Sequence, residues 1–449
     1  MYADRTIASP QDGGFDVKTL RVDVIEGPDA GATHVASEES VSIGTAPTND
    51  LVLRDPTVSR YHLDLTRTSD GVMVVDHGST NGTFLGGTRL FRAAIRRGSV
   101  IRLGQTSLKV LDGEDVHLPT FEGERLGGLV GRSAVMRRLM ARLTRAAASD
   151  TSILLFGETG TGKEVVARAI HDASPRAAGP LETVDCGAIL PTMLASELFG
   201  HEKGSFTGAD QRHIGAFERA QGGTLFLDEI GELPSGMQTA LLGALERRSF
   251  RRIGGKDTIS VDVRVIGATH RDLREEVNSG GFRQDLYFRL AVVTLAIPSL
   301  RERAEDIPLL VEHFLRRMGY DGPTDAIWPD DAMRTLTEHR WPGNVRELRN
   351  VVESSYVMGE APELDPGHRR VESEPPSGTV PNGRSIGVDH VLARPYSEAR
   401  DAVIAEFERL YLDVLKDRAR GNISEAARLA EMNRPYLSRL LKSRGIRWK

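Results

Sequence analysis

Cysteine and long apolar runs are both scarce in this chain of 449 residues. The single cysteine, Cys186, excludes an internal disulfide framework and fits a reducing compartment. No apolar run approaches the roughly 20 residues needed to span a bilayer. Residues 1–20 carry three aspartates where a signal peptide has its apolar stretch. We therefore expect a cytoplasmic protein with no membrane partner.

A large net charge is missing as well. The net charge is −5, and the hydrophobic fraction of 39% and charged fraction of 27% are typical of globular proteins. The basic residues are unevenly placed, since residues 432–449 hold six of them and no acidic residue. This local excess, rather than the whole-chain charge, indicates a nucleic-acid partner at one end. The length predicts about three domains of ~150 residues each.

The first block consists of short apolar runs separated by Gly, Pro, Asn and Asp. Several of the runs alternate with period two, which predicts an all-β sandwich. The runs lie at residues 20–25, 41–43, 50–53, 62–65, 72–75, 100–103 and 108–110. We place this domain at residues 20–113 and expect a polar linker over 112–126.

The second block, residues 127–360, alternates apolar strands with helical segments, which predicts a parallel α/β sheet. A helical lid is expected from about residue 301. The expected strands are 152–156, 224–228 and 263–267, and the expected helices are 164–173, 238–246, 307–318 and 330–339.

The last part of the chain changes composition twice. Residues 361–395 are rich in Pro, Gly, Ser and Glu, which indicates a flexible linker. Residues 396–449 are helical in pattern, with one apolar helix face that serves as a core stripe, as a dimer contact, or as both. That face holds Val403, Phe407, Leu410, Tyr411 and Val414.

A glycine-rich loop with a lysine follows the first expected strand of the α/β block. Its glycines let backbone amides turn toward phosphate oxygens, and Lys163 supplies a cation for the β- and γ-phosphates. Glu164 stands where the strict pattern has a hydroxyl ligand for Mg²⁺. The alternative is a plain strand-to-helix turn. The candidate ATP-binding residues are Gly157, Glu158, Thr159, Gly160, Thr161, Gly162, Lys163 and Glu164.

Two adjacent acids end the expected strand 224–228, about 65 residues after the loop. Asp228 is placed to hold hydrated Mg²⁺, and Glu229 to orient and deprotonate the attacking water. Two acids after an apolar run also occur by chance, but the upstream loop favours a catalytic pair.

Several segments of this block together resemble one family, the AAA+ activators of sigma-54 RNA polymerase, also called bacterial enhancer-binding proteins. They are 157–164, 197–202, 204–209, 282–290, 301–303, 305–307 and 341–348. In that family glutamate follows the loop lysine, so Glu164 fits. The resemblance implies a homo-oligomer, between a dimer and a hexameric ring, that binds ATP and Mg²⁺ between its subunits.

The resemblance also implies roles for individual residues. Arg283 and Arg289 are candidate arginine fingers acting on a neighbouring subunit, although either could be a surface ion pair. Arg346 is the candidate second sensor. Thr269 and His270 lie at the first sensor, where His270 could equally be a solvated loop residue.

The segment Gly204, Ser205, Phe206, Thr207, Gly208 and Ala209 resembles the loop by which the family contacts sigma-54. Its glycines permit a mobile turn, and an exposed Phe206 suits a partner that covers it. The alternative is a phenylalanine buried in its own domain. The chain departs from the family at Asp185, since the family has an asparagine that restrains the catalytic glutamate. We expect Asp185 to repel Glu229, so that one of them is protonated or the switch differs.

The first block resembles a forkhead-associated (FHA) domain, a phosphothreonine-binding sandwich, through segments 42–44, 58–62 and 78–83. The candidate phosphopeptide contacts are Ser59, Arg60, Thr80 and Asn81. His62 is expected to brace the loops. Thr45 replaces the family's arginine, so that either phosphothreonine binding is weakened or Arg54 or Arg60 compensates. The alternative is a sandwich used for docking or dimerisation.

The basic end resembles a Fis-type helix-turn-helix. Residues 422–430 form a capped first helix, 431–433 the turn, and 434–442 a second helix with proline in its first turn. The second helix would enter the major groove of double-stranded DNA. Its candidate DNA contacts are Arg434, Tyr436, Ser438, Arg439 and Lys442.

The multidomain arrangement predicts an ATP-driven activator of sigma-54 RNA polymerase. It would bind an upstream enhancer site and open promoters, gated by a phosphothreonine protein or Ser/Thr kinase instead of the receiver domain of two-component relatives. One alternative is a regulator that acts without sigma-54, disfavoured by the intact Lys163, Asp228 and Glu229. Another is a AAA+ unfoldase, disfavoured by the helix-turn-helix and the 204–209 loop.

Overall fold

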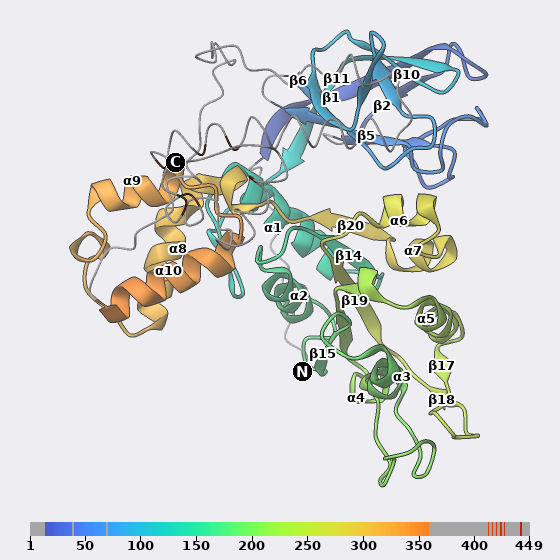
Figure 1. Ribbon diagram of the computed structural model, residues 1–449, viewed down its shortest axis with the longest axis vertical. Helices are drawn as coiled ribbons and strands as arrows, with labels where there is room; N and C mark the ends of the chain where they lie inside the picture. The colour runs from blue at the N-terminus through green and yellow to red at the C-terminus, as the bar shows by residue number, and fades with distance from the viewer. Residues whose placement is uncertain are drawn as a thin grey trace, which may run out of the picture. The chain divides into compact units, whose positions relative to one another are not determined.

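The computed structural model describes residues 14–37, 40–68 and 71–358, together with six scattered residues near the C-terminus (Figure 1). These continuous ranges belong to one compact unit, Met1–Arg370. The expected linker 361–395, the apolar helix face of residues 403–414 and the five candidate DNA contacts lie outside the described residues. No helix in the described ranges combines the length and hydrophobicity of a membrane span.

The N-terminal block is a sandwich of two sheets, as its alternating runs predict. The first sheet has the order β2-β1-β11-β10-β7-β8 and the second β4-β3-β5-β6-β9. The strands are β1 (Gly14–Glu26), β2 (Thr33–Val35), β3 (Ser40–Gly44), β4 (Leu51–Val52), β5 (Leu63–Thr68), β6 (Gly71–Asp76), β7 (Thr83–Leu85), β8 (Thr88–Leu90), β9 (Arg92–Ile95), β10 (Val100–Leu103) and β11 (Thr106–Pro119). Leu20, Val22 and Val24 alternate inward along β1 and are buried with Val41, Leu63 and Ile101 in one core.

The polar linker expected over residues 112–126 is wrong. β11 continues to Pro119, and its far end pairs antiparallel with the start of β1, where Gly14 faces Pro119. β12 (Arg125–Leu126) then pairs with β13 (Leu129–Val130). Strand pairing satisfies the backbone groups of this polar segment, which its composition alone does not reveal.

The second block contains a five-stranded, all-parallel sheet with the order β15-β16-β19-β14-β20. Its strands are β14 (Ile153–Phe156), β15 (Leu181–Asp185), β16 (Thr224–Asp228), β19 (Arg264–Thr269) and β20 (Val293–Ala296). The three predicted strands are all present. Since parallel strands share one carboxyl edge, the residues after β14, β16 and β19 meet there.

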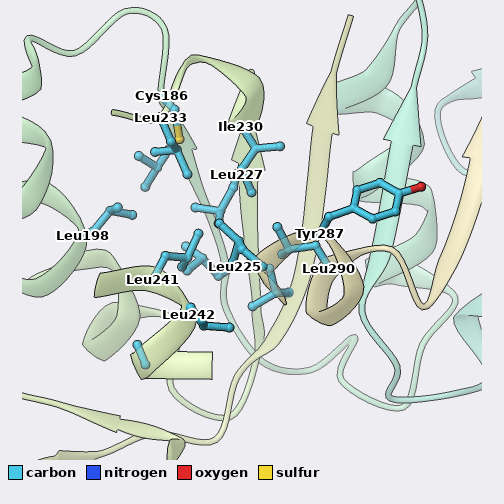
Figure 2. Close-up of a cluster of buried hydrophobic side chains, with 14 of the residues drawn as sticks. Cys186, Leu198, Leu225, Leu227, Ile230, Leu233, Leu241, Leu242, Tyr287 and Leu290 are labelled. Atoms are coloured by element: carbon cyan, nitrogen blue, oxygen red, sulfur yellow. The ribbon is translucent and has the colours of Figure 1, made fainter. Parts of the chain in front are cut away.

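Helices cover both faces of the sheet, which explains why its strands are apolar throughout. Ile153 and Leu155 of β14 face the buried sides of α1 (Ala134–Ala147) and α2 (Lys163–Asp172). Leu154 faces the opposite cluster, built with α3 (Pro191–Phe199), α4 (Ala216–Arg219), α5 (Ser235–Arg247) and α7 (Gln284–Leu290). Figure 2 shows Tyr287 of α7 at the edge of this cluster, its hydroxyl pointing away from the leucines.

The remaining elements complete the second block. The β17–β18 hairpin (Ser249–Phe250, Ile259–Ser260) follows α5, and the short helix α6 (Leu273–Ser279) precedes α7. The lid begins at the 3-10 segment Leu300–Asp306 and contains α8 (Ile307–Arg317), α9 (Asp330–Glu338) and α10 (Asn344–Met358) around fully buried Trp341. The predicted helices in both parts are present, within a few residues at their ends.

Candidate active site

The phosphate loop lies between β14 and α2, as predicted. Gly160 and Gly162 have φ of +81° and +101°, values that glycine adopts without strain. Gly162 is the N-cap of α2 and offers no side chain to it, so the first amides of the helix are left for an anion. Lys163 is 7% exposed and donates to the Gly157 carbonyl over 3.2 Å. The loop is shaped for the phosphates of a nucleotide.

Glu229 is bonded to two predicted site residues. Lys163 Nζ donates to Glu229 Oε1 over 3.1 Å, and His270 Nδ1 lies 2.6 Å from Glu229 Oε2. The His270 amide also donates to Oε2 over 3.3 Å. Because an ionised carboxylate only accepts hydrogen bonds, Nδ1 carries the proton in this pair. His270 therefore holds the carboxylate of Glu229, the candidate base, whereas the sequence left open whether His270 is a solvated loop residue.

The two acids have opposite pKa shifts. Burial raises the pKa of Asp228, and the neighbouring Glu229 and Asp185 carboxylates add to the rise. Burial would also raise the pKa of Glu229, but the hydrogen bond from His270 and the charge of Lys163 outweigh it and lower that pKa. Glu229 is therefore ionised and able to act as a base. A magnesium ion would favour ionised Asp228, and one carboxylate beside nucleotide phosphates is an ordinary Mg²⁺ site.

Asp185 ends β15 opposite Asp228 of β16. Its Oδ1 accepts hydrogen bonds from the amides of Gly187 at 2.9 Å and Ala188 at 3.0 Å. The expected repulsion with Glu229 does not require a protonated Glu229, since the pKa of Glu229 is lowered. The charge of Asp185 instead raises the pKa of Asp228. Restraint of Glu229 in this chain comes from Lys163 and His270.

Thr269, the candidate first sensor, ends β19 and is buried beside the loop. Its carbonyl accepts from the Gly157 amide over 3.2 Å, and its hydroxyl accepts from the Arg271 amide over 3.0 Å. It thus fixes both the start of the phosphate loop and the chain direction after His270.

The lid contacts the phosphate loop through residues to which the sequence assigned no role. Arg301 donates twice to Glu158, and this lowers the pKa of Glu158 to about 2. Asn344 donates to Glu158 Oε2 and to the Thr159 carbonyl, each over 3.1 Å. Both residues lie in segments that resemble the family, 301–303 and 341–348, and this was the signal in the sequence that could have identified them. These bonds tie lid position to loop position.

Arg346 lies where a second sensor should. Its amide donates to the Gly160 carbonyl over 3.2 Å and its side chain is exposed. A Cβ on Gly160 would come within 2.3 Å of the Gly343 carbonyl oxygen, so only glycine permits the lid to approach this closely. The backbone of Arg346 therefore lies beside the phosphate loop of its own chain, and its side chain extends from there.

The two candidate arginine fingers are exposed on α7 and its N-cap. Arg283 pairs with Asp285, at 2.7 Å between Nη2 and Oδ2, and Arg289 donates to the Leu245 carbonyl over 3.0 Å. Neither bond is to the phosphate loop of the same chain. Both guanidinium groups are therefore accessible to another molecule.

The 204–209 loop lies between α3 and α4 and extends from the sheet (Figure 1). Gly204 and Gly208 have φ of +80° and +97°, and a Cβ on either would meet nothing within 4 Å. Phe206 is 48% exposed, with its ring 4.9 Å from that of His201, and Thr207 beside it is exposed. The buried alternative for Phe206 is thus wrong.

The base of this loop is held firmly. Arg252, beyond β17, donates to Glu202 over 2.7 Å and to both oxygens of Glu218. His201 and His213 exchange backbone hydrogen bonds of 3.1 and 3.0 Å across the base. The loop therefore joins the ATPase domain through paired charges and a short ladder.

The four candidate phosphopeptide residues lie on two adjacent loops of the sandwich. The Thr80 amide donates to Ser59 Oγ over 3.0 Å, and Asn81 donates to the Thr57 carbonyl over 2.8 Å. Buried His62 bonds the Ser59 amide and lies 3.4 Å from the Gly82 carbonyl oxygen, so it braces both loops.

Arg60 and Arg54 differ as phosphate ligands. Arg60 is exposed beside Ser59, whereas Arg54 Nε is 2.6 Å from Asp29 Oδ1. Because its charge is already paired, Arg54 is the weaker substitute for the arginine replaced by Thr45.

Comparisons with known proteins agree with this geometry. Residues 129–296 match the sigma-54 interaction domain and 301–374 the AAA+ ATPase lid domain. Residues 23–114 match a family described as the cytoplasmic domain of an inner membrane component of T3SS. The chain is 52% identical over 232 residues to the transcriptional regulatory protein ZraR of Salmonella typhimurium, covering 51% of this chain and 53% of that protein. It is 44% identical to ZraR of Escherichia coli, covering 69% and 67%.

Two solved structures are also similar. NtrX from Brucella abortus in complex with ADP is 38% identical, covers 72% of this chain and 70% of its own, and has a TM-score of 0.49. A phosphothreonine-dependent FHA domain is 28% identical and covers 21% and 96%, with a TM-score of 0.19. The chain thus spans about half the length of the Salmonella relative and about two thirds of the Escherichia coli one.

Proposed function

Because the chain belongs to the sigma-54 activators with an AAA+ ATPase domain, we propose that it remodels sigma-54 RNA polymerase to open promoters. The observation that carries this proposal is the exposed Phe206–Thr207 tip, set between two unhindered glycines in a domain that holds an ATPase site. The tip would press on the sigma factor as hydrolysis proceeds. Binding to an upstream enhancer through residues 396–449 is part of the same proposal.

The site residues have separate tasks in the proposed cycle. Bound Mg·ATP supplies the phosphoryl group and most of the charge to be stabilised. Lys163 leaves Glu229 to bind phosphate, which frees one carboxylate oxygen of Glu229. His270 keeps the other oxygen in place, so Glu229 accepts a proton from water in a fixed orientation. The lid residues Arg301 and Asn344 hold the phosphate loop throughout.

The contact with sigma-54 can be tested by replacing Thr207 with alanine. We expect open-complex formation to fall at least about tenfold, because truncating a central interface contact costs about 2 kcal/mol or more. ATP turnover should be retained, since Thr207 is exposed on a loop and lies outside the nucleotide site. The measurement is in vitro transcription with sigma-54 holoenzyme, alongside ATPase assays.

Thr335→Ala is the matched control, because Thr335 lies on lid helix α9 and its hydroxyl donates to the Asp331 carbonyl of that same helix. It should leave open-complex formation unchanged. Normal promoter opening by the Thr207→Ala protein would contradict the proposed contact of this loop with sigma-54. No promoter opening with sigma-54 holoenzyme even by the unmodified protein would favour a regulator that acts without sigma-54.

We further propose that the sandwich senses a phosphothreonine protein, such as a substrate of a Ser/Thr kinase. Titration with a phosphothreonine peptide library, followed by calorimetry, should find a binder. Arg60→Ala should weaken its binding about 10-fold or more, because hydrogen bonds to charged groups contribute about 1.5–3 kcal/mol. Arg54→Ala should have little effect, since Arg54 already pairs with Asp29.

Two results would count against phosphopeptide sensing. If no peptide binds at millimolar concentration, phosphopeptide sensing is excluded, and docking or dimerisation remains as the role of the sandwich. Equal binding by the phosphorylated and unphosphorylated peptides would show that the phosphate is not recognised.

A further inference from the structure

The two sandwich loops that carry the candidate phosphopeptide residues also contact the ATPase domain. We call them the recognition loops: one holds Ser59 and Arg60, and the other holds Thr80 and Asn81. Tyr61 follows Ser59 and Arg60, and His77 precedes Gly78. The side-chain amide of Asn278, on α6, donates to the Tyr61 carbonyl over 2.6 Å and to the His77 carbonyl over 2.9 Å. One α6 side chain thus holds one backbone group from each loop.

A charge cluster lies next to these bonds. His77 Nδ1 is 2.5 Å from Asp272 Oδ2, at the N-cap of α6, and His77 Nε2 is 3.2 Å from Asp64 Oδ2. Arg274 of α6 pairs with the other oxygen of Asp64. Burial opposes a charge on His77, but hydrogen bonds with Asp272 and Asp64 outweigh it and raise its pKa to about 9. The positive charges of His77 and Arg274 therefore balance the two carboxylates. Charges buried in an interface need such pairing.

Apolar packing joins the same surfaces. Tyr61 is 1% exposed, and its ring meets that of Tyr287 edge-on at a centroid distance of 5.2 Å. Tyr61 and Ala46, both from the sandwich, belong to the hydrophobic cluster that covers one face of the ATPase sheet. The Tyr287 hydroxyl accepts from Arg274 Nε over 3.1 Å. The contact thus has an apolar centre as well as a polar rim.

The docked arrangement leaves the phosphopeptide residues accessible. Arg60, Thr80 and Asn81 are exposed, while Tyr61 and His77, on the same loops, are buried. The ATPase side of the interface is close in sequence to the candidate catalytic site. Asp272 is two residues beyond His270, which holds Glu229. The loops that would bind a phosphothreonine are therefore one short segment away from the catalytic carboxylate.

We propose that Asp272, Arg274 and Asn278 of the α6 segment, with Tyr287 of α7, form a docking surface for the recognition loops of the chain's own sandwich. Docking fixes the His270 segment, which keeps Glu229 in the position where it is bonded to Lys163. Docking thereby opposes the release of Glu229 by Lys163 and restrains ATP turnover. This inference requires neither sigma-54 nor phosphothreonine binding, so it can fail or stand apart from the proposed function.

A disulfide can trap the docked state. A Cβ built on Gly78 lies 2.9 Å from Glu275 Cγ, close to the roughly 3 Å between the Cβ of one cysteine and the sulfur of the other in a disulfide. The experiment uses the full chain with Gly78→Cys and Glu275→Cys. Native Cys186 does not interfere, because burial raises the pKa of its thiol to about 12.

Mild oxidation should produce a link within single chains, detected by peptide mapping and by migration as a monomer on non-reducing gels. The oxidised protein should turn over ATP about 5-fold or more slowly than the same protein after reduction, a typical coupling between sites. Comparing the two forms removes any effect of the substitutions themselves, including the strain of a cysteine at φ +64°.

Gly86→Cys with Glu275→Cys is the matched control. Gly86 also has positive φ, at +54°, but lies in the β7–β8 turn, where a Cβ would meet nothing within 4 Å. This pair should not link. Failure of the Gly78 pair to link, links between two chains, or an oxidised protein with undiminished ATP turnover would each overturn the proposal.

Discussion

Replacing Arg283 or Arg289 with alanine, one at a time, is expected to lower ATP turnover by about 10³-fold or more, the effect of losing an arginine finger. Both residues are exposed on the α7 segment, and neither bonds the phosphate loop of its own chain. Nucleotide binding should persist, because the phosphate-loop lysine and the lid contacts are untouched. The measurement is steady-state ATPase together with nucleotide titration.

A mixing experiment separates action in trans from a structural role. Each arginine variant is combined in equal amounts with Glu229→Gln protein, which has an intact α7 segment. In a random ring, about a quarter of the sites would pair an intact Glu229 with an intact neighbouring arginine. Turnover should therefore recover to a substantial fraction of the wild-type value. No recovery on mixing would mean that the arginine acts within its own chain.

Glu229→Gln alone is expected to lower ATP turnover by about 10²–10⁴-fold, the usual contribution of a general base. Glutamine keeps the shape, its oxygen can accept from Lys163, and its NH2 group can donate to the other tautomer of His270, so nucleotide affinity and stability should change little. Single-turnover kinetics at saturating ATP distinguish slow chemistry from weak binding. A variant that hydrolyses ATP at the wild-type rate would remove Glu229 from the mechanism.

Asp185→Asn provides the comparison, because it restores the residue of the family at that position. Its Oδ1 can keep both amide hydrogen bonds, to Gly187 and Ala188. Since Glu229 in this chain is held by His270 and Lys163, we expect only a small change in turnover. If Asp185→Asn changes the rate of ATP turnover as much as Glu229→Gln does, then Asp185, rather than His270 and Lys163, controls Glu229.

Much of the ATPase domain could be predicted because its signals are local. The apolar strands before Gly157 and Glu229, the glycines of the loop and the first helix of the lid are each encoded in short segments, and the structure has them nearly as expected. The sequence also predicted correctly that Phe206 is exposed at the tip of a loop, because the glycines on either side of it indicate a turn.

The contacts that the sequence could not provide join distant residues. Glu229 meets Lys163 across 66 positions and His270 across 41, and neither pair has a periodic signature. The sandwich bonds α6 through His77 and Asp272, which are 195 positions apart. The extension of β11 was missed for a related reason, because its pairing partner lies near the opposite end of the domain. Such contacts depend on topology rather than on composition.

The glycine-flanked tip has a mechanical consequence. Glycine backbones are the least restricted, and a Cβ on Gly204 or Gly208 would meet nothing within 4 Å. We therefore expect the tip to bend more easily than the root, where Arg252 pairs with Glu202 and Glu218. A load applied at Phe206 bends the tip before it displaces the root. If the loop transmits work from the nucleotide site to a partner, as proposed, the tip must deform first, and the stiffness of the bound partner would help to set how far the partner is moved.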